Sequence, residues 1–305
     1  MIILKNNFGG TMNHNFKVDY EKCTKCGLCI ENCPTNALAP DDYKSPKMNN
    51  PKNCMKCQHC FAICPVGAIS IMDKNPAEAQ MVREINSEDV LNLIQSRRSI
   101  RKYKQENVNK ETIQKLKDML NYVPTGKNNH KLHFSFIENI EVMDEFRTKV
   151  NNSIINFLNT KPVKFFSEKF KKLEGMKKTI EEGKDVIFRT APHLVVVSAP
   201  ITSPCPQQDG IIALSYFELY ANSLGLGTCW CGYAQMILKT FPEFIEYLQI
   251  PQGHTPVYVM LFGYPDIKYT RTTKPNPYNF TTVEKQEIEV GFFTKLKRTF
   301  WNFIR

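Results

Sequence analysis

Apolar residues recur at helix or strand spacing along the last two thirds of the chain, and they predict a series of helices and strands. Helical spacing begins after a polar stretch, with Ser87 as the expected N-cap. The uncharged, β-branched run at 191–199 indicates a buried central strand. A strongly apolar helix is expected to open at Asp209. We therefore predict helices at 87–97, 109–121 and 209–223, and strands at 133–137, 191–199 and 256–265.

Length and composition add a second domain to this picture. The chain has 305 residues, of which 42% are hydrophobic and 23% are charged, and this length exceeds one average domain. No run of about 18 apolar residues is present to span a membrane. The first residues, MIILKNNFGGT, lack the long apolar stretch of a secretory signal. We therefore expect a cytoplasmic protein in a reducing, anaerobic setting, where disulfides do not persist.

The net charge of +10 is spread along the chain except at its end. Residues 291–305 contain four basic and no acidic residues, whereas no basic stripe with interleaved aromatic residues occurs elsewhere. The sequence therefore argues against nucleic-acid binding. The same final segment places aromatic residues on one side of an amphipathic helix, which suits either a membrane-surface anchor or, as we favour, an arm packed on the protein's own dimer.

Cysteines dominate the first part of the chain, where eight of the eleven lie between positions 23 and 64. Residues 23–38 and 54–69 both read C-x2-C-x2-C-x3-C-P, at an offset of 31. Three thiolates at intervals of three can reach three corners of one iron–sulfur cube, while the fourth cysteine points away toward a second cluster. Paired zinc sites are the alternative, but they leave the third cysteine and the Cys-Pro without a role. The spacing therefore favours iron–sulfur chemistry.

With these two complete motifs, residues 12–73 resemble the bacterial two-[4Fe-4S] ferredoxin family. The resemblance implies a module that moves single electrons and catalyses nothing itself. His59, which falls among the cysteines, is expected to be a solvated side chain rather than a ligand. The implied ligands are Cys23, Cys26, Cys29 and Cys64 for the first cluster, and Cys54, Cys57, Cys60 and Cys33 for the second.

Four segments of the remaining chain together resemble the FMN-dependent nitroreductase family over about residues 87–280. They are RRSIR at 97–101, PTGKN at 124–128, LGLGTCW at 224–230, and GYP at 263–265 followed by basic residues. The resemblance implies an α+β fold, with helices around an antiparallel or mixed sheet, and FMN at the interface of a homodimer. No G-x-G-x-x-G follows a strand, so no Rossmann nicotinamide domain is predicted.

The same resemblance assigns FMN contacts to individual residues. The first segment would contact the phosphate, ribityl chain and pyrimidine edge of FMN, and the second would cover the ring from the other subunit. The third would present backbone amides to flavin N5, and the late basic residues would meet the phosphate. The implied contacts are Arg97, Ser99, Arg101, Pro124, Thr125, Asn128, Trp230, Cys231, Gly232, Arg271 and Lys274. His130 stands where the family often has glutamine, and Cys229 and Cys231 are expected to be inert thiols rather than a redox pair.

The sequence thus predicts a ferredoxin-like domain at 12–73, a linker at 74–86, an FMN-binding domain at 87–285 and a basic tail at 286–305. Clusters carry one electron, whereas FMN holds one or two. Our leading hypothesis is that a low-potential donor such as reduced ferredoxin reduces the clusters, which reduce FMN. Hydride would then pass to a nitroaromatic, a quinone or an activated alkene. The alternatives are an NAD(P)H-driven nitroreductase that uses the clusters as an electron outlet, and a non-catalytic redox sensor.

Overall fold

A computed structural model describes residues 14–160 and 168–285 of the chain. The chain divides into two units, Met1–Arg271 and Thr272–Arg305. Among the described residues, no helix has both the length and the apolar character needed to cross a bilayer. The predicted amphipathic helix in the tail lies outside the described residues.

The cysteine-rich part, residues 14–73, is built from short elements. Strand β1 pairs with β4 and β2 pairs with β3, both antiparallel. Two short helices and one 3-10 turn lie between the strands, and a second 3-10 turn follows strand β4. The elements are β1 (Lys17–Val18), α1 (Leu28–Glu31), β2 (Leu38–Pro40), β3 (Pro46–Met48), η1 (Pro51–Asn53), α2 (His59–Ile63), β4 (Ile69–Ser70) and η2 (Pro76–Glu78).

The 31-residue sequence repeat is also a backbone repeat. Gly27 precedes α1 with φ 79°, and Gln58, 31 positions later, precedes α2 with φ 60°. Lys25 and Lys56 are likewise both left-handed, at φ 58° and 57°. Left-handed backbone is unfavourable for residues with a Cβ, so its recurrence at matched positions shows that both loops are held in one required shape.

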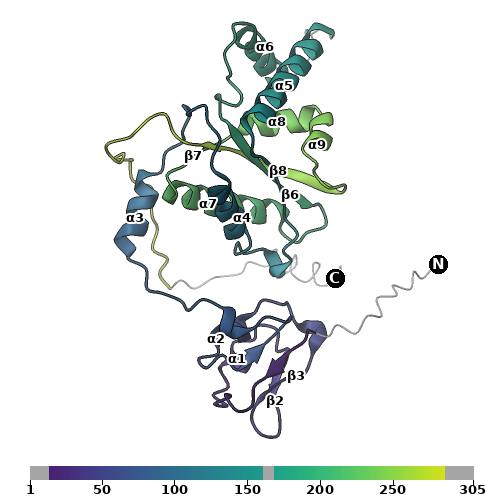
Figure 1. Ribbon diagram of the computed structural model, residues 1–305, viewed down its shortest axis with the longest axis vertical. Helices are drawn as coiled ribbons and strands as arrows, with labels where there is room; N and C mark the ends of the chain where they lie inside the picture. Colours follow the sequence, from purple (N-terminus) through teal and green to yellow (C-terminus); the bar gives the residue numbers. More distant parts are fainter. Residues whose placement is uncertain (1–13, 161–167, 286–305) are drawn as a thin grey trace, which may run out of the picture. The chain divides into compact units, whose positions relative to one another are not determined.

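The sheet part, residues 87–271, is organised around a four-stranded sheet with the order β5-β6-β8-β7 (Figure 1). All neighbouring strands are antiparallel, and β5 and β7 form its two edges. The strands are β5 (His133–Ile137), β6 (His193–Pro200), β7 (Gly227–Trp230) and β8 (His254–Gly263). The helices are α3 (Ser87–Ser96), α4 (Lys110–Leu120), α5 (Ile140–Thr160), α6 (Glu168–Glu181), α7 (Pro206–Ser223), α8 (Gly232–Thr240) and α9 (Glu243–Tyr247), with a 3-10 turn η3 at Gly126–Asn128.

Helices cover both faces of this sheet, as the uncharged central strand requires. Along β6, Leu194 and Val196 point to a core shared with α5, α8 and α9. Val195 and Val197 point to a second core shared with α4 and α7. Because alternate side chains of a strand face opposite sides, a strand that is buried on both faces must be uncharged and largely apolar along its length. The α+β class expected from the sequence, with helices around an antiparallel sheet, is confirmed.

Most predicted elements are present, with corrected ends. The strand at His133–Ile137 has the expected bounds, and the helix at Lys110–Leu120 differs by one residue at each end. Ser87 is not the N-cap of α3, because the side chain of Asn86 accepts the backbone N–H of Glu88 at 2.9 Å. Helix α7 begins three residues before Asp209, with a proline in its first turn, where the missing N–H costs nothing.

Candidate functional site

The eight motif cysteines surround two separate cavities. Each cavity takes three cysteines from one motif and the fourth cysteine of the other motif, as the sequence resemblance implied. One cavity is lined by Cys23, Cys26, Cys29 and Cys64. The other is lined by Cys33, Cys54, Cys57 and Cys60.

Cys33 and Cys64, the fourth cysteine of each motif, accept equivalent backbone hydrogen bonds. The N–H of Ala37 donates to Cys33 Sγ at 3.3 Å, and the N–H of Ala68 donates to Cys64 Sγ at 3.2 Å. Burial acts to raise the pKa of Cys33, but backbone N–H donors from Leu38 and its neighbours outweigh burial and lower it. Such donors stabilise sulfur as the thiolate, which is the form that ligates metal.

The arrangement of thiols fits a cluster with several corners. In the described residues, no three His, Cys, Asp or Glu side chains converge on one point, as a single metal ion would require. His59 is exposed at the rim of the second cavity, in agreement with the solvated side chain expected from the sequence. The cysteine-rich part therefore gathers four thiols around each of two cavities.

A second candidate site lies beside β7, where the RRSIR segment runs along the sheet. The N–H of Ile100 donates to the carbonyl of Thr228 at 2.8 Å, and Ser99 forms an isolated bridge with Thr228. A Cβ on Gly227 would lie 2.5 Å from Ile100 Cγ1, so only glycine permits this approach. Gly225, at φ 78°, follows the end of α7 as a left-handed cap residue.

Next to this contact is a cavity of about 470 Å³. Its volume falls within the range of about 300–1,000 Å³ that is usual for small-molecule and cofactor sites. Of the predicted FMN contacts, Arg101, Trp230, Cys231 and Gly232 line it, whereas Arg97 and Ser99 do not. Arg189 also lines it, and sequence reasoning missed this residue because nothing around it forms a motif.

Not every backbone amide in this segment is available to a ligand. The N–H of Cys231 donates to the carbonyl of Val259 at 2.9 Å as part of the sheet. Gly232 instead begins α8, and the first N–H groups of a helix have no carbonyl partner within it. The cavity therefore combines amide donors at the start of a helix with two arginines, a set that fits an anionic, hydrogen-bonding cofactor such as FMN.

The two cysteines beside the cavity are poor nucleophiles. Burial raises the pKa of Cys229 and raises that of Cys231 to about 12. The thiol of Cys231 also donates to the carbonyl of Ile187 at 3.2 Å. This structure agrees with inert thiols rather than a redox pair.

The predicted second-subunit loop, residues 124–130, has a tightly constrained backbone. Lys127, Asn128 and His130 all have positive φ, between 46° and 55°. The N–H of Gly126 donates to Asp209 at 2.8 Å. Asn128 Oδ1 accepts a hydrogen bond from Nε2 of the His130 ring at 2.9 Å, and the Asn128 side-chain NH2 donates to the carbonyls of Met55 and Lys56 at 3.2 Å.

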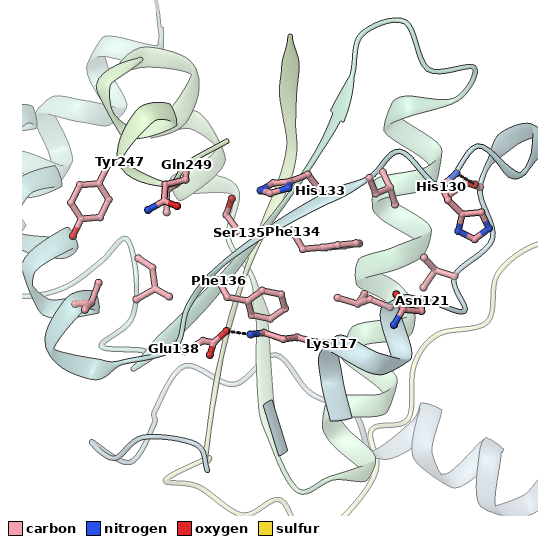
Figure 2. A pocket seen from close by; sticks show the side chains of 17 residues that line it. Lys117, Asn121, His130, His133, Phe134, Ser135, Phe136, Glu138, Tyr247 and Gln249 are labelled. Carbon is pink, nitrogen blue, oxygen red and sulfur yellow. Dashed lines mark hydrogen bonds and ion pairs between the residues drawn. The ribbon is translucent and has the colours of Figure 1, made fainter. Parts of the chain in front are cut away.

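Within one chain, this loop borders a different cavity. Thr125 and His130 line a cavity of about 660 Å³ along β5, shown in Figure 2. There Lys117 Nζ and Glu138 Oε1 form an ion pair at 2.5 Å, and Lys117 lies 5.5 Å from the ring centroid of Phe136. Because β5 and β7 are opposite edges of the sheet, a single chain does not bring the loop and the β7 cavity around one ligand.

The remaining predicted contacts are exposed. Pro124 is exposed at the start of the loop. Arg271 is exposed and does not line the β7 cavity. Lys274 is also exposed and belongs to the second unit of the chain.

Comparison with known proteins adds two matches along the sequence. Residues 94–264 match the nitroreductase family, and residues 22–68 match a 4Fe-4S dicluster domain. No curated protein matches the chain. The first of these matches spans more than half of the 305 residues.

Solved structures show the same fold. A nitroreductase with bound FMN from Bacteroides fragilis NCTC 9343 is 21% identical, with a TM-score of 0.53, and the likeness covers 66% of this chain and 100% of that one. A nitroreductase with bound FMN from Desulfitobacterium hafniense DCB-2 is 23% identical, with a TM-score of 0.51 and the same coverage. At these identities the likeness establishes the fold of the sheet part.

Proposed function

Because the chain belongs to the nitroreductase family and carries a 4Fe-4S dicluster domain, we propose that it is an oxidoreductase that joins one-electron and two-electron chemistry. Electrons from two [4Fe-4S] clusters would reach FMN and leave as hydride to a small organic acceptor, either a nitroaromatic, a quinone or an activated alkene. The observation that carries the proposal is the grouping of eight cysteines around two cavities, in one chain with the β7 cavity.

We propose that Cys23, Cys26, Cys29 and Cys64 hold one cluster, and that Cys54, Cys57, Cys60 and Cys33 hold the other. The exchange of the fourth ligand ties the two motifs into one folding unit. Matched N–H donors to both exchanged cysteines support an equivalent role for them. In these sites the clusters would supply low-potential single electrons, and FMN would convert them into hydride transfer.

For FMN, we propose the cavity beside β7. Arg101 and Arg189 would place positive charge against an anionic ligand, and the amide of Gly232 would donate a hydrogen bond. The loop at 124–130 would complete the site from the second subunit of a homodimer, since the two groups of residues lie at opposite sheet edges in one chain. Its constrained backbone suits a surface that is preorganised to cover a ligand.

The test compares cysteine variants under anaerobic conditions. Cys57→Ala should lower the iron content from about eight to about four atoms per chain, because one four-iron cluster is lost. FMN should stay bound, and turnover with a chemical reductant should persist. Turnover driven by reduced ferredoxin should fall sharply. Cys26→Ala should give the same pattern through the other cluster.

Cys205→Ala is the matched control, because this cysteine lies outside both ligand sets, and it should keep full iron and full activity. Undiminished ferredoxin-driven turnover in Cys26→Ala and Cys57→Ala would refute the proposed electron path. Rapid anaerobic bleaching of the flavin by NAD(P)H, with no bleaching by reduced ferredoxin, would favour the NAD(P)H-driven alternative instead.

A further inference from the structure

One buried carboxylate on α7 connects two segments next to the β7 cavity. Glu218 is 7% exposed, and the other buried residues of α7 from 210 to 221 are apolar. Its Oε1 accepts hydrogen bonds from Arg97 Nη1 and Thr228 Oγ1, both at 3.2 Å. Its Oε2 accepts a third from Trp230 Nε1 at 3.0 Å. Donors from the RRSIR segment and from β7 therefore converge on one side chain.

The energetics of burial make this convergence necessary. A carboxylate removed from water is costly unless it is paired and hydrogen-bonded. Hydrogen bonds to a carboxylate are stronger than those between neutral groups, so the three donors compensate for the burial of Glu218. Because both oxygens belong to one planar group, the guanidinium of Arg97 and the indole of Trp230 are held in fixed relation to each other.

Glu218 does not itself line the cavity, so any effect on a ligand passes through its partners. Trp230 does line it, and its ring also packs edge-on against Tyr258, with centroids 5.2 Å apart. The segment that starts at Arg97 continues to Arg101, whose side chain lines the same cavity. Glu218 thus sits behind both of these cavity walls.

We propose that Glu218 is a positioning residue of the flavin site, holding Trp230 and the segment from Arg97 to Arg101 in the geometry that binds FMN. The inference rests on the proposed function, since it takes the β7 cavity as the FMN site. Glu218 also neutralises Arg97, which leaves the positive charge of the cavity to Arg101 and Arg189.

The experiment uses the full chain with Trp301→Phe, which makes Trp230 the sole tryptophan because the sequence contains two. Glu218→Gln keeps the shape of the side chain but replaces one acceptor oxygen by an NH2 donor, so at least one partner must face another donor. We expect the FMN dissociation constant to rise about tenfold or more, as for loss of a hydrogen bond to a charged group. The tryptophan emission and near-UV circular dichroism of the FMN-free chain should change as well.

Two further variants separate positioning from a general loss of structure. Glu145→Gln removes an exposed carboxylate paired with Lys149 at 3.3 Å and should leave FMN affinity and the Trp230 signals unchanged. Thr228→Val removes one donor to Glu218 without touching the cavity lining and keeps the side-chain volume. It should weaken FMN binding by about threefold, less than Glu218→Gln does, because the donors from Arg97 and Trp230 remain. It also provides the test if Glu218→Gln does not fold.

The outcomes distinguish this inference from the proposed function. If the parent chain binds FMN while Glu218→Gln and Thr228→Val bind it equally tightly, with unchanged Trp230 signals, the positioning role is refuted and the flavin site stands. If the parent chain binds no FMN, the proposed function fails, and the inference that rests on it fails with it. Weaker binding in both variants together with altered Trp230 signals supports the inference.

Discussion

His193 should make the stability of the sheet part depend on pH. Its side chain is fully buried on β6, and its ring packs against Phe262 with centroids 5.2 Å apart. Its Nε2 accepts the backbone N–H of Val108 at 2.9 Å, which requires the neutral ring. Protonation would place a charge in an apolar core and set an N–H against an N–H. Burial accordingly lowers the pKa of His193 from 6.5 to about 4.

The size of the effect follows from linkage between folding and protonation. The unfolded chain binds the proton more readily than the folded chain, so stability rises with pH between about 4 and 6.5. The contribution is complete above pH 6.5 and is lost as the pH falls toward 4. At about 1.4 kcal/mol per unit of pKa, the full loss is about 3 kcal/mol, and about 2 kcal/mol is lost by pH 5.

The assay is urea unfolding at pH 7.5 and pH 5 for the parent chain and for His193→Gln, whose amide oxygen can still accept from Val108. Between the two pH values, the parent should lose about 2 kcal/mol more free energy of unfolding than the variant. The other titrating groups are common to both proteins and cancel in this difference. His59→Gln, at an exposed position, should behave as the parent does. Equal losses in the parent and in His193→Gln would refute the neutral, buried imidazole.

Two further predictions concern the β7 cavity. Gly227→Ala should destabilise the chain by about 1–3 kcal/mol and weaken FMN binding, because the new Cβ collides with the segment at Ile100. Gly225→Ala is the control, because its φ of 78° strains an alanine but the space around it is open; it should lower the free energy of unfolding by about 1 kcal/mol. In a flavin fluorescence titration, this control should bind FMN as the parent does. Equal FMN affinity in Gly227→Ala and Gly225→Ala would contradict the steric argument. In native alkylation at pH 8 followed by peptide mass spectrometry, Cys231 should stay unmodified because its pKa is raised to about 12. Of the three cysteines outside the proposed ligand sets, the half-buried Cys205 should react first. Fast labelling of Cys231 would show that its thiol is neither buried nor protonated.

Local patterns were sufficient for most of the secondary structure. The β-branched run at 191–199 predicted β6 because a largely apolar strand with no charged side chain on either face needs cover on both faces. Helix starts were less certain, since Asn86 and Ser87 are both good capping residues and are adjacent. Likewise, Asp209 suits a first turn as well as an N-cap, and the true start of α7 lies three residues earlier.

The residues of the candidate sites likewise fall into those that local motifs identified and those that only the structure places. The resemblance of the cysteine motifs to two-cluster ferredoxins implied two sets of four cysteines, and the structure gathers each set around one cavity. Motif comparison also identified Arg101, Trp230 and Gly232 beside the β7 cavity. It had no means of finding Arg189 or the occupied amide of Cys231, which depend on distant segments.

By itself, the sequence determined the two-part composition, the iron–sulfur chemistry of the first part and the family of the second. These properties reside in spacings of a few residues, where chain connectivity fixes what can meet. Only the tertiary structure decided that Glu218, in an apolar helix, lies behind Arg97 and Trp230, more than 100 residues from the first and 12 from the second. Sequence pattern could not specify that contact, because it arises from how helix α7 packs across the sheet, and burial of a carboxylate is tolerated only where such packing delivers its donors.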